Sequence, residues 1–228
     1  AQVICWPDPA IANWPEEADG VMVRMTPITG DQIRKAKKLK VICKQGVGFE
    51  TIDVATAHER GIPVCRTPGI NSEAVAEMAL ALSLDVARRT SRFDRMLRRG
   101  DKIVRPQHLG IEMFGKTIGI VGMGNIGRNI AKKWIGAFDA KILALDPNAP
   151  SDRWADIPHQ RCANLNELLP QVDLLSLHIP MRESNRHIIG AKEIALMKRN
   201  AILINVSRGG LIDEVALFEA LKMGIYSA

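Results

Sequence analysis

The sequence predicts an α/β protein built on a doubly wound parallel sheet, accompanied by a second, smaller α/β domain. Short and nearly continuous apolar runs alternate with segments of helical periodicity along most of the chain. This alternation is typical of parallel strands that are covered by helices on both faces. One apolar run ends in the glycine pattern G-x-G-x-x-G at residues 122–127, directly before a helical segment. We place the smaller domain at residues 1–70 and the larger one at residues 71–228.

The smaller domain is expected to alternate short strands with helices. Its strands are the apolar runs at residues 3–5, 20–23, 41–43 and 62–65, and its helices lie at residues 31–38 and 53–60. Asp31 and Asp53 stand where N-caps are expected, and Gly61 is a helix stop signal.

The larger domain is expected to begin with a long helix at residues 72–97, in which Ser72 is the N-cap and apolar residues follow at helical spacing. Such a helix could bridge the two domains. Further strands are expected at residues 117–122, 141–145, 172–177 and 201–205, with a short piece near Arg161. Helices are expected between them at residues 125–137, 165–169, 191–197 and 214–223. Asn164 and Glu167 fit a capping box, and Asp213 stands where an N-cap is expected.

The glycine pattern has a physical explanation at each position. Gly122 permits the tight turn from strand to helix, Gly124 lets the backbone approach a pyrophosphate, and Gly127 allows the helix to pack closely on the strand. The helix N-terminus then presents free N–H groups and a partial positive charge to the phosphates. Asp146, at the end of the next strand, is expected to accept hydrogen bonds from the adenosine ribose and to repel a 2′-phosphate. The pattern predicts a dinucleotide site that favours NAD over NADP, against the simpler interpretation that the glycines only serve turns.

Ligands of open parallel sheets bind beyond the carboxyl ends of the strands. Besides Gly122 and Asp146, this rule selects the residues that follow the later strands, His178-Ile179-Pro180 and 206–210. Arg208 is the strongest chemical candidate among them, because a guanidinium at a strand end can hold a carboxylate through two parallel hydrogen bonds and polarise a neighbouring carbonyl. The alternative is a surface ion pair between Arg208 and Asp213 or Glu214.

A second glycine loop, at residues 44–49, follows a strand of the smaller domain. Its backbone N–H groups could form an anion-binding nest, to which Lys44 adds positive charge, and a carboxylate substrate would suit it. Taken alone, the loop is equally well explained as a plain turn.

Composition narrows the class of protein. Of the 228 residues, 46% are hydrophobic and 25% are charged, which is ordinary for a soluble globular protein. No apolar stretch reaches the length of a membrane span and no secretory leader is recognisable, so we expect no membrane association and a cytoplasmic location. The four cysteines share no metal-ligand spacing. We therefore expect buried thiols in a reducing compartment, and no metal site.

The formal net charge of +6 is concentrated in one segment, which contains Arg88, Arg89, Arg92, Arg95, Arg98, Arg99, Lys102 and Arg105. Binding of nucleic acid would require aromatic platforms or a recognition motif nearby, and Phe93 is the only aromatic residue there. A solvated helix face or a subunit interface explains the segment better, and no nucleic-acid partner is expected.

Five ordered motifs, which span nearly the whole chain, resemble the D-isomer-specific 2-hydroxyacid dehydrogenase family. They lie at residues 46–53, 66–77, 122–127, 178–180 and 205–213. The resemblance implies a Rossmann-type NAD domain, here without its last strands, and a smaller flavodoxin-like substrate domain.

The resemblance also implies roles for individual residues. Arg208 would be the catalytic arginine that binds the carboxylate and carbonyl of the substrate. The implied substrate-binding set is Arg24, Lys44, Gln45, Gly46, Val47 and Asn71. The implied NAD-binding set is Val47, Gly122, Gly124, Asn125, Ile126, Gly127, Asp146, His178, Ile179, Pro180, Val206, Ser207 and Arg208. In the phosphoglycerate-oxidising branch the positions of Arg24 and Lys44 hold phosphate-binding arginines; either cation could equally be ordinary surface charge.

Two departures from the family concern the acid/base chemistry. The family carries its catalytic glutamate and histidine in G-L-D-V-F-type and P-H-x-G-type segments, and this chain ends before such segments. We therefore expect a truncated or partial dehydrogenase. None of the five histidines stands in the matching context; they are His58, His108, His159, His178 and His187. His178 belongs to the cofactor loop by the resemblance, with acid/base work as its alternative role.

The resemblance predicts an NAD-dependent oxidoreductase that acts on a small D-2-hydroxy acid or 2-oxo acid of the 3-phosphoglycerate, glyoxylate or hydroxypyruvate type. It also implies a homodimer, for which residues 72–105 are a suitable interface. Two alternatives remain. One is a non-catalytic, NAD(H)-sensing interaction protein of the corepressor type, and the other is a short chain that only binds nucleotide.

Overall fold

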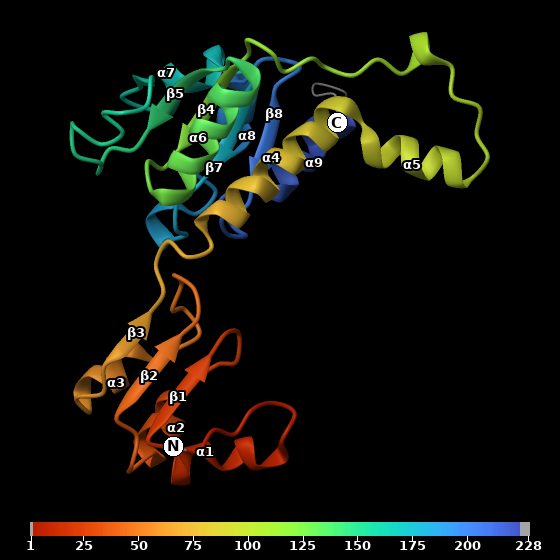
Figure 1. Ribbon diagram of the computed structural model, residues 1–228. Helices are drawn as coiled ribbons and strands as arrows, with labels where there is room; N and C mark the ends of the chain where they lie inside the picture. Colours follow the sequence, from red (N-terminus) through yellow and green to blue (C-terminus); the bar gives the residue numbers. More distant parts are fainter. Residues whose placement is uncertain (1, 224–228) are drawn as a thin grey trace. The chain divides into compact units, whose positions relative to one another are not determined.

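The computed structural model describes residues 2–223, and it divides into two units, Ala1–Asn71 and Ser72–Ala228. Both units consist of parallel strands and helices, as the ribbon in Figure 1 shows. This confirms the expected α/β class. The two units are described separately below.

The first unit is a three-stranded parallel sheet in the order β1-β2-β3, formed by β1 Gly20–Val23, β2 Val41–Lys44 and β3 Val64–Arg66. Its helical segments are η1 Pro9–Asn13, α1 Trp14–Glu17, α2 Gly30–Lys35 and α3 Val54–Glu59. The helices bury aliphatic side chains against the sheet in one cluster that consists of Ile28, Ile33, Ala36, Leu39, Ile42, Ile52, Ala57 and Ile62. The strands and helices expected between residues 20 and 66 are therefore present, with shorter helices.

Two expectations for the first unit are wrong. Residues 3–5 are not a strand: Val3 is 78% exposed and pairs with no strand among the described residues. The N-cap of α2 is Thr29 rather than Asp31, because Thr29 and Gln32 form a reciprocal capping box at the first turn. Asp53 is the N-cap of α3, as expected, and its carboxylate accepts a hydrogen bond from the Thr56 N–H at 2.9 Å.

The second unit contains a five-stranded sheet in the order β6-β5-β4-β7-β8, in which all strand pairs are parallel. The strands are β4 Thr117–Val121, β5 Lys141–Leu145, β6 Gln160–Arg161, β7 Leu174–Leu177 and β8 Ile202–Asn205. From the central β4 the chain first runs outward through β5 to β6 and then returns to β7 and β8. The strand order therefore reverses between β4 and β7, which is the position where doubly wound sheets bind ligands.

Helices cover both faces of this sheet, and alternate residues of each strand enter two separate cores. Ile142 and Ala144 of β5 pack in the cluster that contains α4 and α6, whereas Leu143 and Leu145 pack in the cluster that contains α7, α8 and α9. The helical segments of this unit are α4 Ser72–Arg88, α5 Thr90–Arg98, η2 Arg105–Gln107, α6 Asn125–Phe138, α7 Leu165–Leu168, η3 Leu169–Gln171, η4 Glu183–Asn185, α8 Ala191–Leu196 and α9 Glu214–Lys222.

The predicted single helix at residues 72–97 is wrong, because the chain breaks into α4 and α5 at Arg89. Arg89 adopts φ 58°, a left-handed conformation that a helix interior does not allow. The carboxylate of Asp85 then caps the new helix: it accepts hydrogen bonds from the N–H and hydroxyl of Ser91, both at 2.7 Å, and from the hydroxyl of Thr90. These donors lower the pKa of Asp85. Ser72 is the first residue of α4 rather than the N-cap before it.

The expected caps in the rest of the unit are largely present. Asn164 caps α7 and accepts a hydrogen bond from the Glu167 N–H at 3.0 Å, but the Glu167 carboxylate reaches the N–H of Ala163 instead of closing the box on Asn164. The carboxylate of Asp213 caps α9 by accepting hydrogen bonds from Val215 and Ala216, both at 3.1 Å.

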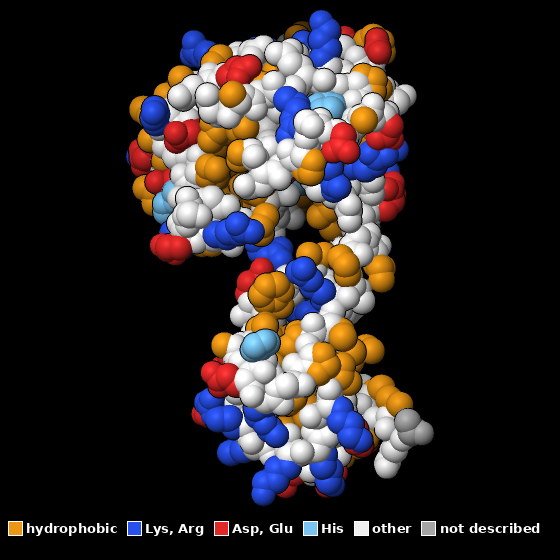
Figure 2. All heavy atoms as spheres, turned by 90° about the vertical axis from the view of Figure 1, so that its left-hand side faces the viewer, with side chains coloured by type: hydrophobic (Ala, Val, Ile, Leu, Met, Phe, Trp, Pro, Cys, Tyr) orange, Lys and Arg blue, Asp and Glu red, His pale blue; other side chains and the backbone are white. Residues whose placement is uncertain are grey.

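The molecular surface mixes charges of both signs. On the face drawn in Figure 2, basic side chains are interspersed with acidic and apolar ones over both units. Among the described residues, no helix combines the length and the apolar character that a membrane span requires. The four cysteines are free thiols, but the expectation that they are buried holds only for Cys162; Cys5 and Cys65 are exposed and Cys43 is half-buried.

Candidate functional site

The glycine loop lies at the carboxyl end of β4, beside the end of β7. Gly122 has φ 103°, and its N–H donates to the Leu145 carbonyl at 2.8 Å. A Cβ atom at Gly122 would lie 2.5 Å from the carbonyl oxygen of His178 and 2.9 Å from the side chain of Ile179. Only glycine therefore allows both this backbone conformation and the close approach of the β7 end.

The other two glycines of the pattern differ from each other. A Cβ atom at Gly127 would overlap the carbonyl oxygen of Gly122 and lie 3.1 Å from the indole of Trp154, so this glycine is required for packing. At Gly124 no atom lies within 4 Å of the position of a Cβ, so its surroundings are open. Gly124 is the N-cap of α6 and provides no side chain to cap the first-turn N–H groups. An open backbone in front of uncapped N–H groups fits the pyrophosphate of a dinucleotide.

Asn125 and Ile126 occupy the first turn of α6, directly behind Gly124. Asn125 is exposed and Ile126 is half-buried. Both therefore lie where the expected pyrophosphate would meet the helix N-terminus.

Asp146 follows β5 and reaches back to the glycine loop. One carboxylate oxygen accepts a hydrogen bond from the Met123 N–H at 2.9 Å, and the other accepts one from the Asn148 N–H at 3.0 Å. Each oxygen retains a lone pair that can accept a further hydrogen bond. The acid is thus held beside the loop in a position that suits a ribose hydroxyl, and its contact with a ribose stays a prediction.

His178, Ile179 and Pro180 follow β7. The N–H of His178 donates to the Val121 carbonyl at 2.8 Å, while its ring Nε2 shares a hydrogen bond of 2.9 Å with the hydroxyl of Ser176. The ring Nδ1 is buried and has no hydrogen-bond partner within the described part of the chain. Burial lowers the pKa of His178 to about 4, so the imidazole is neutral near pH 7. These surroundings argue against a role of this histidine in acid/base catalysis. Its expected role in the cofactor loop then depends on its backbone.

The loop after β8 is fastened to β7. The hydroxyl of Ser207 donates to the Leu177 carbonyl at 2.5 Å, and the side-chain amide of Asn205 donates to the Arg208 carbonyl at 2.8 Å. Val206 packs against the core next to α4 and α6. The Arg208 side chain is exposed, and one of its nitrogens donates to the Ser207 carbonyl at 2.8 Å.

The second glycine loop, in the first unit, is less open than expected. The N–H of Gln45 donates to the Val23 carbonyl at 2.9 Å, and the N–H of Gly46 donates to the Thr67 hydroxyl at 2.8 Å. Two of the donors of the expected nest are therefore already used. Val47 is 42% exposed, and its carbonyl accepts a hydrogen bond from Arg66 at 3.4 Å.

The Lys44 side chain is buried and hydrogen bonded, unlike a cation on the surface. Its side chain is only 6% exposed, and its ammonium group donates to the backbone carbonyl of Arg24. The charge expected at the loop is thus directed into the unit, whereas the Arg24 side chain is exposed. Asn71 is the last residue of the first unit and is exposed as well.

Two arginines that no sequence motif marks, Arg153 and Arg161, lie around the segment between β5 and β6. Nε of Arg153 donates to the Met123 carbonyl of the glycine loop at 2.8 Å. Arg161 donates to the carbonyls of Pro150 and Ala149 at 2.7 and 2.8 Å and to that of Asp146 at 3.2 Å. No motif marks these residues, because their contacts depend on how the segment folds back over the loop.

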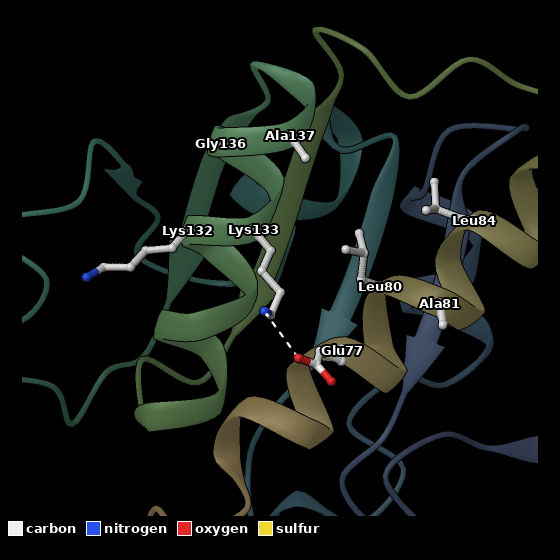
Figure 3. Close-up of a pocket in the computed structure, with 8 residues that line it drawn as sticks. All are labelled: Glu77, Leu80, Ala81, Leu84, Lys132, Lys133, Gly136 and Ala137. Carbon is white, nitrogen blue, oxygen red and sulfur yellow. Dashed lines mark ion pairs between the residues drawn. The ribbon is translucent and has the colours of Figure 1, made fainter.

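A separate apolar groove runs between α4 and α6. Leu80, Ala81 and Leu84 of α4 line it together with Gly136 and Ala137 of α6, and Figure 3 shows Lys133 and Glu77 paired across it at 3.9 Å. It contains none of the predicted site residues and is therefore distinct from the glycine-loop site.

Comparison with known proteins identifies the family. The model of the NAD-binding domain of D-isomer specific 2-hydroxyacid dehydrogenases matches residues 80–228. The chain belongs to this family. The second unit, with its glycine loop, is thus an NAD-binding domain, which confirms the expected family, fold and cofactor.

Individual relatives support the assignment. The chain is 44% identical over 210 residues to a D-3-phosphoglycerate dehydrogenase of Methanocaldococcus jannaschii, with 92% of this chain and 40% of the relative covered. It is 42% identical over 214 residues to a hydroxypyruvate reductase of Thermotoga maritima, with 93% of this chain and 68% of the relative covered. The crystal structure of a D-lactate dehydrogenase of Aquifex aeolicus, complexed with NAD and lactic acid, matches with a TM-score of 0.81 at 30% identity, covering 97% of this chain and 66% of that one. The chain thus spans between about two fifths and two thirds of the length of these relatives.

Proposed function

We propose that this chain forms the NAD site and part of the substrate site of an oxidoreductase that transfers hydride between nicotinamide and C2 of a small D-2-hydroxy acid or 2-oxo acid. The observation that carries the proposal is the glycine loop at the point where the strand order reverses, with Asp146 hydrogen bonded to the Met123 N–H at 2.9 Å. NAD, when bound, supplies the hydride acceptor, and the residues of the chain bind and orient the reactants.

The proposed NAD-binding residues lie along the carboxyl edge of the second sheet. The N–H groups of α6 face the pyrophosphate, Asp146 accepts hydrogen bonds from the adenosine ribose, and the backbone after β7 and β8 lines the remainder. The set consists of Gly122, Gly124, Asn125, Ile126, Gly127, Asp146, His178, Ile179, Pro180, Val206, Ser207 and Arg208, to which the resemblance adds Val47 of the first unit.

Arg208 is the proposed catalytic residue. A guanidinium that binds the substrate carboxylate side-on also lies next to the C2 carbonyl and stabilises the negative charge that develops there during hydride transfer. Arg208 is exposed at the end of β8, where solvent and a substrate can reach it.

The proposed substrate is of the 3-phosphoglycerate, glyoxylate or hydroxypyruvate type, in keeping with the names of the relatives. In the first unit Gln45, Gly46, Val47 and Asn71 would contact the carboxylate, and Arg24 would add charge. Lys44 is proposed only to position Arg24, because its ammonium group donates a hydrogen bond to the backbone carbonyl of Arg24.

We also propose that the chain forms a homodimer through residues 72–105. α4 carries large apolar side chains on its surface, with Met78 56% and Leu82 41% exposed, and no residue of α5 is buried. Measurement of the molar mass by light scattering after gel filtration tests this. A mass of one chain at micromolar concentration would contradict it.

The activity is tested by NADH oxidation with hydroxypyruvate, glyoxylate, phosphohydroxypyruvate and pyruvate in parallel, using the purified full-length gene product and its Arg208→Ala variant. We expect turnover on at least one substrate and its collapse in the variant. NADH binding without turnover on any of the four would instead favour the NAD-sensing role.

A further inference from the structure

Three sulfur-bearing side chains form one row across the sheet of the first unit. Met22 of β1 pairs with Cys43 of β2, and Cys43 pairs with Cys65 of β3. The three strands lie side by side and are parallel, as Figure 1 shows. Residues that pair directly on neighbouring strands point to the same face of a sheet. The pairing therefore brings two thiols and one thioether to one face, although helix α3 separates the two cysteines along the chain.

This face is turned away from the core of the first unit. Ile42 of β2 is buried in that core, and Val21 of β1 and Val64 of β3 pack against it. Successive side chains of a strand point to opposite faces, so the sulfur-bearing neighbours of these three residues point away from the core. Met22 is 81% exposed, and Cys65 is exposed as well. Both ends of the row are therefore open to a small solute.

The row offers soft ligands and no hard ones. The three strands contain no histidine and no carboxylate. Among the described residues, no three side chains of the types His, Cys, Asp and Glu gather as metal ligands, so the third ligand here is a thioether. Thiolate and thioether sulfur together select Cu(I), whereas Ca²⁺ and Mg²⁺ require oxygen ligands. Zn²⁺ takes Cys, His and carboxylate ligands, usually four of them, and a thioether is not among them. Monovalent copper is thus the ion that this set of ligands suits.

The spacing of the strands favours a bridging ion over a disulfide between Cys43 and Cys65. Both are free thiols in the structure. Paired residues on neighbouring strands are about 4.8 Å apart. A disulfide requires Cβ atoms about 3.5–4.5 Å apart, so the two strands would have to approach each other. A trigonal ion with bonds of about 2.3 Å holds its sulfurs about 4 Å apart, which rotation of the side chains achieves. The flexible, unbranched side chain of Met22 can then bring its sulfur to the third position.

We propose that Met22, Cys43 and Cys65 form a binding site for a monovalent copper ion. Both thiols release their protons when the ion binds, so that it is held by two thiolates and one thioether. The proposal concerns the first unit alone and does not depend on the NAD site. It departs from the expectation of no metal site, which was based on the spacing of the cysteines along the chain and not on the pairing of the strands.

The test is an anaerobic titration of the reduced full-length gene product with Cu(I), in competition with the chromophoric chelator bicinchoninate. Cys65→Ser should lower the affinity for Cu(I) about a hundredfold or more, because a hydroxyl is a poor ligand for a soft ion. Cys65 is exposed, so its substitution should leave Tm nearly unchanged. Cys5→Ser is the matched control, since Cys5 is an exposed thiol outside the sheet, and it should leave the affinity unchanged.

Met22→Leu and Met25→Leu separate the role of the thioether from that of the thiols. Met25 is 72% exposed, as accessible as Met22, but it lies beyond the end of β1. Met22→Leu should weaken Cu(I) binding about tenfold, and X-ray absorption at one equivalent of copper should show two sulfur neighbours instead of three. Met25→Leu should change neither the affinity nor the number of sulfur neighbours.

Equal affinity of the wild-type protein and Cys65→Ser for Cu(I) would overturn the proposal. Equal affinity of Met22→Leu and Met25→Leu would overturn the three-sulfur site, since it would leave two thiolates as the ligands. A disulfide between Cys43 and Cys65 in protein purified without reductant, detected by peptide mapping, would contradict the spacing argument and overturn the proposal as well.

Discussion

Substitution of Gly127 by alanine tests whether the glycine loop is shaped by packing in the way that the structure shows. The new Cβ would overlap the carbonyl oxygen of Gly122 and lie 3.1 Å from Trp154 and 3.2 Å from Ile120. Neither the backbone of the loop nor the buried indole can move away cheaply. The helix α6 and the loop must therefore separate, or the contact must remain strained.

Two effects of opposite sign determine how much Gly127→Ala changes the free energy of unfolding. Alanine is favoured over glycine inside a helix by about 1 kcal/mol. Forcing an extra methyl group into a packed interior costs about 1–3 kcal/mol, and here the obstacle is backbone. The backbone obstacle places the cost in the upper part of this range, at about 2–3 kcal/mol. We therefore expect a net loss of roughly 1–2 kcal/mol in the free energy of unfolding, which corresponds to a decrease in Tm of about 2–8 °C for a protein of this size.

Gly136 provides the matched control, because it lies on the same helix and nothing is within 4 Å of the position of its Cβ. Gly136→Ala should therefore show only the propensity effect and stabilise the protein by about 0.5–1 kcal/mol. Urea unfolding followed by the fluorescence of the buried Trp134 and Trp154 measures both variants. Equal stability of Gly127→Ala and Gly136→Ala would refute the packing argument.

Three further predictions follow from other parts of the second unit. Asp146→Asn removes the charge beside the ribose and should weaken NADH binding about tenfold in a fluorescence titration; unchanged affinity would remove Asp146 from the site. His178 has a pKa of about 4 in the folded protein, below the value of about 6.5 in the unfolded chain. As the pH falls, the unfolded state therefore takes up the proton first, and the free energy of unfolding should decrease by up to about 3 kcal/mol between pH 6.5 and 4. Urea unfolding across this pH range should show a flatter profile for His178→Asn, and identical profiles would contradict the assignment. Asp85→Ala removes the cap of α5, so it should lower the free energy of unfolding by about 1 kcal/mol and speed amide exchange in residues 90–98. Asp94→Ala loses an exposed ion pair and should change both quantities little.

The sequence was sufficient to predict the features whose physical constraint acts between residues close together along the chain. The glycine loop was predicted correctly because positive φ at Gly122 and close packing at Gly127 both demand glycine at fixed spacing. Asp53 and Asp213 were recognised as caps because the donors that they satisfy lie within the next three residues.

The sequence was insufficient where the outcome depends on partners that are distant along the chain. Residues 3–5 have the apolar character of a strand but find no neighbouring strand among the described residues. The Lys44 ammonium group is held by a carbonyl on another strand end, that of Arg24. Arg153 lies in a polar loop without a motif, and its hydrogen bond to Met123 spans 30 positions. The break at Arg89 could have been suspected, because Asp85 precedes Thr90 and Ser91 at a distance that allows a second cap.

The central claim, that a dinucleotide binds over the glycine loop, is tested most directly by NADH titration of Gly124→Val. Gly124 has an extended conformation that valine can adopt, and its surroundings are open, so folding should change little and Tm should stay within a few degrees of the wild-type value. The valine side chain would occupy the space that the pyrophosphate needs. The account predicts that the affinity for NADH falls at least about tenfold at nearly unchanged Tm. Wild-type affinity in a folded Gly124→Val protein would contradict it.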